Sequence, residues 1–374
     1  MRPKQIRMKR NLSKPEIDPP GRNVLEVSLF GPGYGESVVI HAGEEDWLII
    51  DSCVLNDKKT PAALSYLMAI GVDPSTAVKL ILATHWHDDH IRGIAHLYRA
   101  CNKAIFSCSQ ALNKEDFITL AYVALENAKT ETSGTDEFTS VLQELGMRGD
   151  SPVWAIADRP LWNREIGINS KLWALSPSNR IVSQSFQSVG QNLIPDKSPT
   201  KRIPPPEINH GAVVSLLKVG DIAVLLGADL ENTTSMNAGW SAVIGSHSRP
   251  KFRAKIYKVS HHGSASSDSP EIWSELLENQ PIAILTPFSR GNSNLPTTHD
   301  IQRLNSHTSQ VFTTKILASK RAITGSGPIA RTKREALRHC HKLTMVPGHV
   351  RVRIDIKTRV ENIDLFDGAK LLAN

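Results

Sequence analysis

Residues 84–90 of this 374-residue chain read THWHDDH, which places three histidines and two aspartates within six consecutive positions. Imidazole nitrogens and carboxylate oxygens are common protein ligands of zinc and manganese, so this density of both groups predicts a metal site. Residues two apart on extended backbone project to the same side, which lets His85 and His87 hold one ion. Asp89 and His90 lie past a turn and can hold a second ion. The spacing therefore indicates a site for two divalent metal ions.

A two-ion site needs further ligands from other parts of the chain. Asp229 ends the apolar stretch IAVLLGAD and is expected to bridge the two ions. The pair His261 and His262 in SHHGS follows another strand-like stretch and offers a last imidazole. Because successive side chains on extended backbone alternate, one of the two points at the ions and its neighbour points aside. We expect His262 to be the ligand and His261 to handle a proton or the phosphate.

Four other polar residues are expected to support the site. Asp51 ends the stretch WLIID and is predicted to hold a ligating imidazole by a hydrogen bond. Glu36 and Ser37 follow the glycine-rich turn GPGYG, and their neighbourhood to Asp51 indicates that they line the site. Lys258, in KVSHHGS, is expected to supply or relay a proton to the leaving oxygen.

The stretches around these residues predict an alternation of strands and helices, because apolar runs favour strands and apolar residues at helical spacing favour helices. Strands are predicted at residues 24–31, 37–43, 46–51, 78–84, 171–178, 212–219, 222–229, 254–259, 282–288 and 349–356. Helices are predicted at residues 60–71, 91–100, within 110–146, and at 270–279, 298–306 and 331–342. The metal-ligand candidates therefore lie where strands end, which is the usual position of a site in an open α/β fold.

THWHDDH, together with WLIID, LLGAD and SHHGS, resembles the metallo-β-lactamase superfamily. Through GPGYGES, the lysine in KVSHHGS and RGNSNLPTTHDIQRL, the chain also resembles the branch typified by the hydrolase domain of the DNA-uptake protein ComEC. The likeness covers about residues 25–310 and implies a dinuclear hydrolase. The superfamily pattern has a ligand histidine before its hairpin, which makes His210 in EINHGAVVS a candidate ligand. The ComEC branch usually has another residue there, and ComEC itself is a membrane channel.

The predicted fold is an α/β, four-layer αββα metallo-β-lactamase sandwich, because strands precede and follow the helices at 61–146. We expect a basic flexible arm at residues 1–23 and a hydrolase domain at residues 24–310. The polar, proline-rich region at about 150–208 is expected to be an insertion or lid. Residues 311–374 are expected to form a basic C-terminal extension packed on the domain.

The net charge of +7 lies mainly near the chain ends. Residues 1–14 carry six Lys/Arg and no acid, and residues 315–342 carry eight Lys/Arg and one acid. These segments together carry +13, which leaves −6 for the remainder of the chain. Basic segments attract polyanions, although they also occur as solvated surfaces. The candidate nucleic-acid-binding residues are Arg331, Lys333, Arg334 and Arg338.

Targeting signals are missing from the printed sequence. No apolar run approaches the roughly 20 residues of a membrane helix, and the basic N-terminus lacks the apolar stretch of a secretory signal. The four cysteines, Cys53, Cys101, Cys108 and Cys340, form no Cys-x-x-Cys pair. We therefore expect a cytoplasmic protein with free thiols and no membrane partner.

The sequence thus predicts a hydrolase with two divalent metal ions, zinc or manganese, as cofactors. The favoured reaction is phosphodiester hydrolysis, above all of nucleic acid, by a hydroxide that bridges the ions. Asp89, His261 and Lys258 are the candidate catalytic residues. One alternative is a small-molecule hydrolase acting on a lactone, thioester or cyclic nucleotide, and another is a non-catalytic metal-binding module. The resemblance also suggests a bacterial defence or mobile-element module; the oligomeric state and a protein partner stay open.

Overall fold

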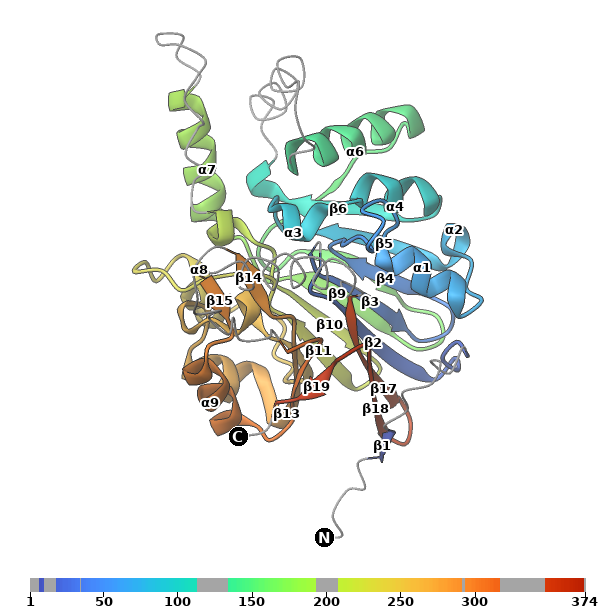
Figure 1. Cartoon of the computed structure of the whole chain (residues 1–374). Coiled ribbons are helices and arrows are strands. Elements are labelled where there is room, and N and C mark those ends of the chain that lie inside the picture. Colours follow the sequence, from blue (N-terminus) through green and yellow to red (C-terminus); the bar gives the residue numbers. More distant parts are fainter. Residues whose placement is uncertain are drawn as a thin grey trace, which may run out of the picture.

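Two β-sheets stack face to face, with helices on both outer sides, in a computed structural model of the chain (Figure 1). The structure describes residues 7–9, 18–33, 35–112, 134–192, 208–290, 293–316 and 347–372. Three hydrophobic clusters fill the spaces between the layers, one between the sheets and one under the helices on each side. This arrangement confirms the predicted αββα sandwich.

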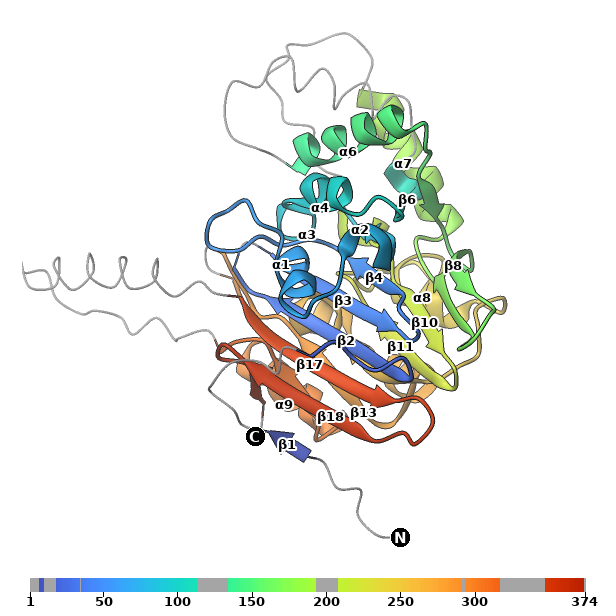
Figure 2. The same cartoon turned by 90° about the vertical axis from the view of Figure 1, so that its right-hand side faces the viewer.

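The first sheet joins the two ends of the chain. Among the described residues it has nine strands, in the spatial order β1 (Arg7–Lys9), β18 (Glu361–Phe366), β17 (Gly348–Asp355), β2 (Val24–Gly31), β3 (Ser37–Ala42), β4 (Trp47–Ile50), β5 (Val78–Ala83), β6 (Ile105–Ser109) and β7 (Val153–Ala155). β17 lies between β2 and β18 and is antiparallel to both, and Figure 2 shows these strands side by side. β4 to β7 run parallel to one another, so their carboxyl ends meet at one edge.

The second sheet has eight strands within the described part of the chain. Their order is β19 (Lys370–Leu371), β16 (Val311–Thr313), β13 (Leu277–Leu285), β12 (Ala254–Lys258), β11 (Ile222–Leu226), β10 (Ser215–Val219), β9 (Ser170–Ala174) and β8 (Pro160–Arg164). β10 and β11 form the predicted antiparallel hairpin, whereas β11, β12, β13 and β16 run parallel. A separate hairpin pairs β14 (Phe288–Arg290) with β15 (Ser293–Leu295).

Helices cover the outer faces of both sheets (Figure 1). The first sheet is covered by α1 (Ala62–Ala69), α2 (Pro74–Ala77), α4 (Ile94–Ala100) and α6 (Gly134–Arg148). The second sheet is covered by α8 (Gly239–Gly245) and α9 (Thr298–His307). The remaining helical segments are α3 (Asp88–Ile91), α7 (Asn179–Asn192), η1 (Gln110–Leu112), η2 (Ile208–Gly211), η3 (Ser260–Gly263), η4 (Ala265–Ser267) and η5 (Ile272–Leu276).

Burial on both faces explains why β5 reads as one continuous apolar run. Leu80 and Leu82 point into the core between the sheets. Ile81 and Ala83 point to the opposite face, into the cluster beneath the helices. A parallel strand covered on both sides shows such a run instead of alternation. The strand ends at the polar residues that begin the metal-binding motif.

Several expected boundaries differ from the structure. The boundary at residue 310 separates no two structural parts, because β16 and β19 complete the second sheet and β17 and β18 belong to the first. The expected insertion or lid at 150–208 contributes β7 to the first sheet and β8 and β9 to the second. Within the expected arm at 1–23, β1 pairs with β18. The predicted helix at 270–279 is shorter, since β13 begins at Leu277.

The predictions of no membrane helix and of free cysteines can be compared with the described residues. No described helix has the length and apolar character needed to cross a membrane. Cys53, Cys101 and Cys108 are free and buried, while Cys340 lies outside the described residues.

Candidate metal centre

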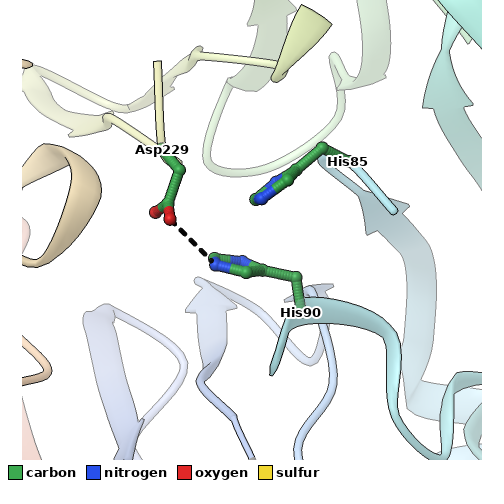
Figure 3. Close-up of side chains that lie close together, drawn as sticks. All are labelled: His85, His90 and Asp229. Carbon is green, nitrogen blue, oxygen red and sulfur yellow. Dashed lines mark ion pairs between the residues drawn. The ribbon is translucent and has the colours of Figure 1, made fainter. Parts of the chain in front are cut away.

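The predicted ligands gather where strands of both sheets end. β5 leads into His85, β11 leads into Asp229, and the short helix α3 carries His90. Figure 3 shows these three side chains converging from three segments, and one ligand atom from each lies within 4.8 Å of the other two. A second set of three within the same distance consists of Asp89, His90 and His262. The fold therefore brings together residues that are far apart in the sequence.

Asp51 fixes the orientation of two imidazoles. His90 Nδ1 lies 2.7 Å from Asp51 Oδ2, and because a carboxylate only accepts, the imidazole donates there. The Thr84 hydroxyl also donates to Asp51, at 2.8 Å, and lies 2.9 Å from His85 Nδ1. Since the single O–H of Thr84 already donates a hydrogen bond to Asp51, the Thr84 oxygen accepts the hydrogen bond from His85 Nδ1. Both histidines are thus held at Nδ1, so Nε2 is the nitrogen of each ring that can face a metal ion.

The remaining ligand candidates surround these nitrogens. His87 Nδ1 lies 3.2 Å from His85 Nε2. Asp229 Oδ2 lies 3.4 Å from His90 Nε2 and 3.5 Å from His262 Nε2, and Asp89 Oδ2 lies 3.7 Å from His262 Nε2. Ligands bound at 2.0–2.1 Å to a tetrahedral ion lie about 3.3–3.4 Å from one another. These separations therefore suit shared coordination.

The hydrogen-bond inventory of the centre fits a bound cation. Of the twelve buried side-chain polar atoms of the described residues that lack a hydrogen-bond partner, four lie at this centre: Glu36 Oε2, His90 Nε2, Asp229 Oδ1 and His262 Nε2. Leaving such atoms unsatisfied costs about 1–3 kcal/mol each, more for charged groups. A divalent ion between the imidazoles and carboxylates would satisfy the ligand atoms. The residues present therefore fit the metal centre that the sequence predicts.

The candidate ligands differ in protonation. Burial lowers the pKa of His85 well below its ordinary value and likewise lowers the pKa of His87, so both imidazoles are neutral at pH 7. Burial raises the pKa of Asp89, but His262 and His90 outweigh it and hold this pKa below its usual range. Metal ligation requires neutral imidazoles and ionised carboxylates. Burial lowers the pKa of His90 and of His262, but neighbouring carboxylates, Asp229 foremost, outweigh burial and raise both pKa values above their ordinary value, so a bound ion would displace a proton from each.

Lys258 lies inside the centre, with its side chain buried. Its ammonium pairs with Glu36 Oε1, donates to the carbonyl of Ala228 at 3.1 Å and lies 3.7 Å from Asp229 Oδ1. Burial lowers the pKa of Lys258, but Glu36 and Asp229 outweigh burial and raise this pKa above its ordinary value. The lysine is therefore a fixed positive charge between two carboxylates.

The glycine-rich turn supports the metal-binding loop through its backbone. The amide of Glu36 donates to the carbonyl of Asp89 at 2.8 Å. Gly35 has φ +121°, and a Cβ added there would lie 2.2 Å from the same carbonyl oxygen. Ser37 donates its hydroxyl to the carbonyl of Asp51 at 3.0 Å. A side chain at position 35 would thus displace the loop that carries Asp89.

Backbone strain accompanies the ligands. Positive φ values occur at Asp51 (59°), Ala228 (46°), His261 (44°) and His262 (56°). Non-glycine residues rarely adopt this region, and such conformations persist where the surrounding structure holds them in place. Four of the ten non-glycine residues with positive φ in the described chain thus lie at the ends of β4, β11 and β12, beside the candidate ligands.

The two consecutive histidines have different surroundings. His262 is buried and points Nε2 into the ligand set, while His261 is partly exposed and places Nδ1 2.7 Å from Glu231 Oε1. Glu231 is a residue that the sequence analysis missed, because an isolated glutamate after a strand carries no distinctive spacing. His210 lies in η2 and belongs to none of the groups of candidate ligands that lie within 4.8 Å of one another among the described residues.

Four predicted residues cannot be placed. The nucleic-acid-binding candidates Arg331, Lys333, Arg334 and Arg338 lie outside the described residues. Their assignment stays a prediction.

A comparison with family models matches residues 30–114 to the metallo-beta-lactamase superfamily. The matched segment contains Glu36, Asp51 and the candidate ligands His85, His87, Asp89 and His90, so the superfamily resemblance is confirmed over this part of the chain. No comparison addresses the ComEC-type branch. No curated protein matches the chain.

Solved structures of low sequence identity are also similar to this chain. The metallo-beta-lactamase fold protein YhfI from Bacillus subtilis has 13% identity and a TM-score of 0.32, covering 63% of this chain and 69% of its own. A B3 metallo-beta-lactamase with an active-site glutamic acid has 16% identity and a TM-score of 0.34, and the match covers 70% of this chain and 87% of that protein. MEM-A1, a subclass B3 metallo-beta-lactamase from a soil metagenome library, has 14% identity and a TM-score of 0.31, covering 69% and 83%.

Proposed function

We propose that the chain is a metal-dependent phosphodiesterase that uses two divalent ions, zinc or manganese, and acts on nucleic acid. The observation that carries this proposal is the group of buried imidazole and carboxylate atoms without hydrogen-bond partners, spaced as ligands of shared ions. The proposed ligands are His85, His87 and His210 for the first ion, Asp89, His90 and His262 for the second, and Asp229 for both.

When bound, two divalent ions neutralise charge on the phosphoryl oxygens and make a nucleophile available from water near neutral pH. The protein's part is to hold the ligands in place before the substrate arrives. Asp51 does so through His90 directly and through the Thr84 hydroxyl for His85. Lys258 offsets the charge of Glu36 and Asp229, which would otherwise repel each other inside the fold.

Proton transfer to the leaving oxygen is assigned to His261. Its Nδ1 is held by Glu231, which leaves Nε2 as the nitrogen that can face a substrate, and the side chain is partly exposed beside the ligands. Lys258 is less suited to this task than the sequence suggested, because its ammonium is enclosed and its pKa is raised. General acids work best with a pKa near the operating pH. We therefore assign Lys258 a positioning role.

One observation favours a second candidate, a small-molecule hydrolase of the same superfamily. Two acidic side chains near the candidate ligands, Asp88 and Glu231, have exposed fractions of 45% and 24%; Arg92 lies 3.9 Å from Asp88, and His261 lies 2.7 Å from Glu231. Such carboxylates repel a polyanion unless cations elsewhere offset them. The basic segments at 1–14 and 315–342 supply that offset in the sequence and support the nucleic-acid reading. A role in a defence or mobile-element module stays a prediction.

The testing experiment incubates the protein with labelled single- and double-stranded DNA and RNA under zinc, manganese and magnesium. We expect cleavage with zinc or manganese and none after chelation. The Asp229→Ala variant is expected to cleave nothing, because it lacks the carboxylate shared by both ions. Hydrolysis of lactone or thioester substrates without any polynucleotide cleavage would favour the small-molecule enzyme. Metal binding without any hydrolysis would favour a non-catalytic module.

A further inference from the structure

The turn that carries His262 is the least regular part of the metal centre. His261 and His262 both have positive φ, and they follow β12 within the short segment η3. The carbonyl of Gly263 accepts from Arg303 Nη2 at 2.7 Å, which ties the far side of the turn to α9. Because the turn has no strand or helix geometry, the direction of the His262 ring depends on contacts made by the ring itself.

The segment that follows β13 makes two such contacts. His262 Nδ1 donates to the carbonyl of Thr286 at 2.9 Å, which fixes one nitrogen of the ring. The ring of Phe288, two residues further on in β14, stacks on the imidazole with centroids 5.0 Å apart and planes 22° apart. The hydrogen bond alone leaves the ring free to tilt about that nitrogen, whereas the stacked ring restricts its plane.

We propose that Phe288 is a positioning residue for the second metal ion, because its ring holds the plane of His262 so that Nε2 faces Asp89 and Asp229. The inference rests on the proposed two-ion centre. Phe288 provides no ligand atom and acts only through His262. The first ion would be held through His85 and His87. The Thr84 hydroxyl, itself bonded to Asp51, holds His85 Nδ1, and Phe288 takes no part in these contacts, so we expect binding of the first ion to be independent of Phe288.

The experiment titrates the metal-stripped protein with Co²⁺, whose visible absorption reports each binding event. For the wild-type protein we expect two events. For Phe288→Ala we expect one event at wild-type affinity and one weakened about 10–100-fold, as for other residues that orient a ligand. Phe288→Tyr keeps the flat ring and should restore the second event. Phe288→Leu keeps apolar volume without a flat ring and should remain weakened, with the fold checked by circular dichroism.

Phe252→Ala is the matched control, because Phe252 is also half-buried and its ring packs on Trp173, with centroids 6.0 Å apart, away from the ligands. This control is expected to keep both binding events. An unchanged second event in Phe288→Ala, with two events in the wild type, would overturn the inference and leave the two-ion centre standing. Fewer than two events in the wild type would overturn both. Equal weakening in Phe252→Ala and Phe288→Ala would reduce the effect to general loss of packing and overturn the positioning role.

Discussion

At the scale of single residues, the metal centre is a concentration of buried negative charge. The carboxylates of Glu36, Asp51 and Asp229 are buried, and Lys258 pairs with the first of them. Buried charges of one sign are costly unless cations compensate them. The sequence predicted the candidate ligands because THWHDDH has a rare composition. It missed Thr84 as the link between Asp51 and His85, since a single threonine after a strand has no distinguishing pattern.

The paired histidines give the sharpest residue-scale prediction. His262→Ala should lose both metal content and hydrolysis, because its Nε2 lies among the ligand atoms. His261→Ala should keep metal content and lose about 10²–10⁴-fold in rate, as expected for removal of a general acid. Elemental analysis and steady-state rates on the same preparations measure both. The opposite pattern would mean that the two assignments are exchanged.

At the scale of elements, the site exists because strands of both sheets end at one edge. Apolar runs predicted most of these strands, including β5, β11 and β12. The predicted helix at 270–279 ends early, at Leu276, because Leu277 pairs with Ala254 of the neighbouring strand, and such a pairing overrides local helical spacing. The pairing of β17 with β2, which places β17 between β2 and β18, could not be predicted either, since pairing partners far apart in sequence leave no local pattern.

The turn between β2 and β3 lies close to the loop that carries Asp89, and a substitution at Gly35 tests whether this contact supports metal binding. Gly35→Ala should unfold at lower temperature and lose bound metal, because the added Cβ would lie 2.2 Å from the Asp89 carbonyl oxygen. Gly71→Ala is the matched control, since Gly71 also has a positive φ but no atom within 4 Å of the added Cβ. It should lose only modest stability and keep its metal. Equal metal content in both variants would show that the approach of the turn does not hold Asp89.

β17 carries a buried histidine that makes stability depend on pH. Burial lowers the pKa of His349 well below its ordinary value, and Arg351 and Arg353 lower it further. Below about pH 6.5 the unfolded chain therefore binds a proton that the folded chain does not, and stability falls by up to about 1.4 kcal/mol per pH unit. With chelator present, the unfolding temperature of the wild type should fall more between about pH 7.5 and about pH 5.5 than that of His349→Gln. Parallel pH profiles would contradict this.

At the scale of the whole molecule, the C-terminal strands complete both sheets, so the candidate metal centre and these strands belong to one sandwich. The basic residues at 315–342 led to the prediction of a C-terminal extension packed on the domain, and the strand predicted at 349–356 did not reveal which sheet it joins. The charge of a segment indicates which partners it attracts, but it does not indicate which sheet a neighbouring strand joins. The layered fold could be predicted from the strand and helix order, whereas its boundaries could not.

The basic segments are tested by charge reversal. Replacing Arg331, Lys333, Arg334 and Arg338 by glutamate should weaken binding to long DNA or RNA. Each lost phosphate contact should flatten the slope of log affinity against log salt by roughly 0.7–0.9. Hydrolysis of bis-nitrophenyl phosphate should stay nearly unchanged, because the ligands lie elsewhere in the chain. Unchanged polynucleotide binding would assign this segment to another partner and favour a small substrate.

The central claim is that two ions held by His85, His90, Asp229 and their neighbours hydrolyse a phosphodiester. The most direct measurement is the rate of bis-nitrophenyl phosphate hydrolysis as zinc or manganese is returned to chelator-stripped protein. The account predicts no hydrolysis in the stripped protein, a rate that rises until about two equivalents are bound, and no rise in Asp229→Ala. Hydrolysis by the stripped protein, or none with both ions bound, would contradict it.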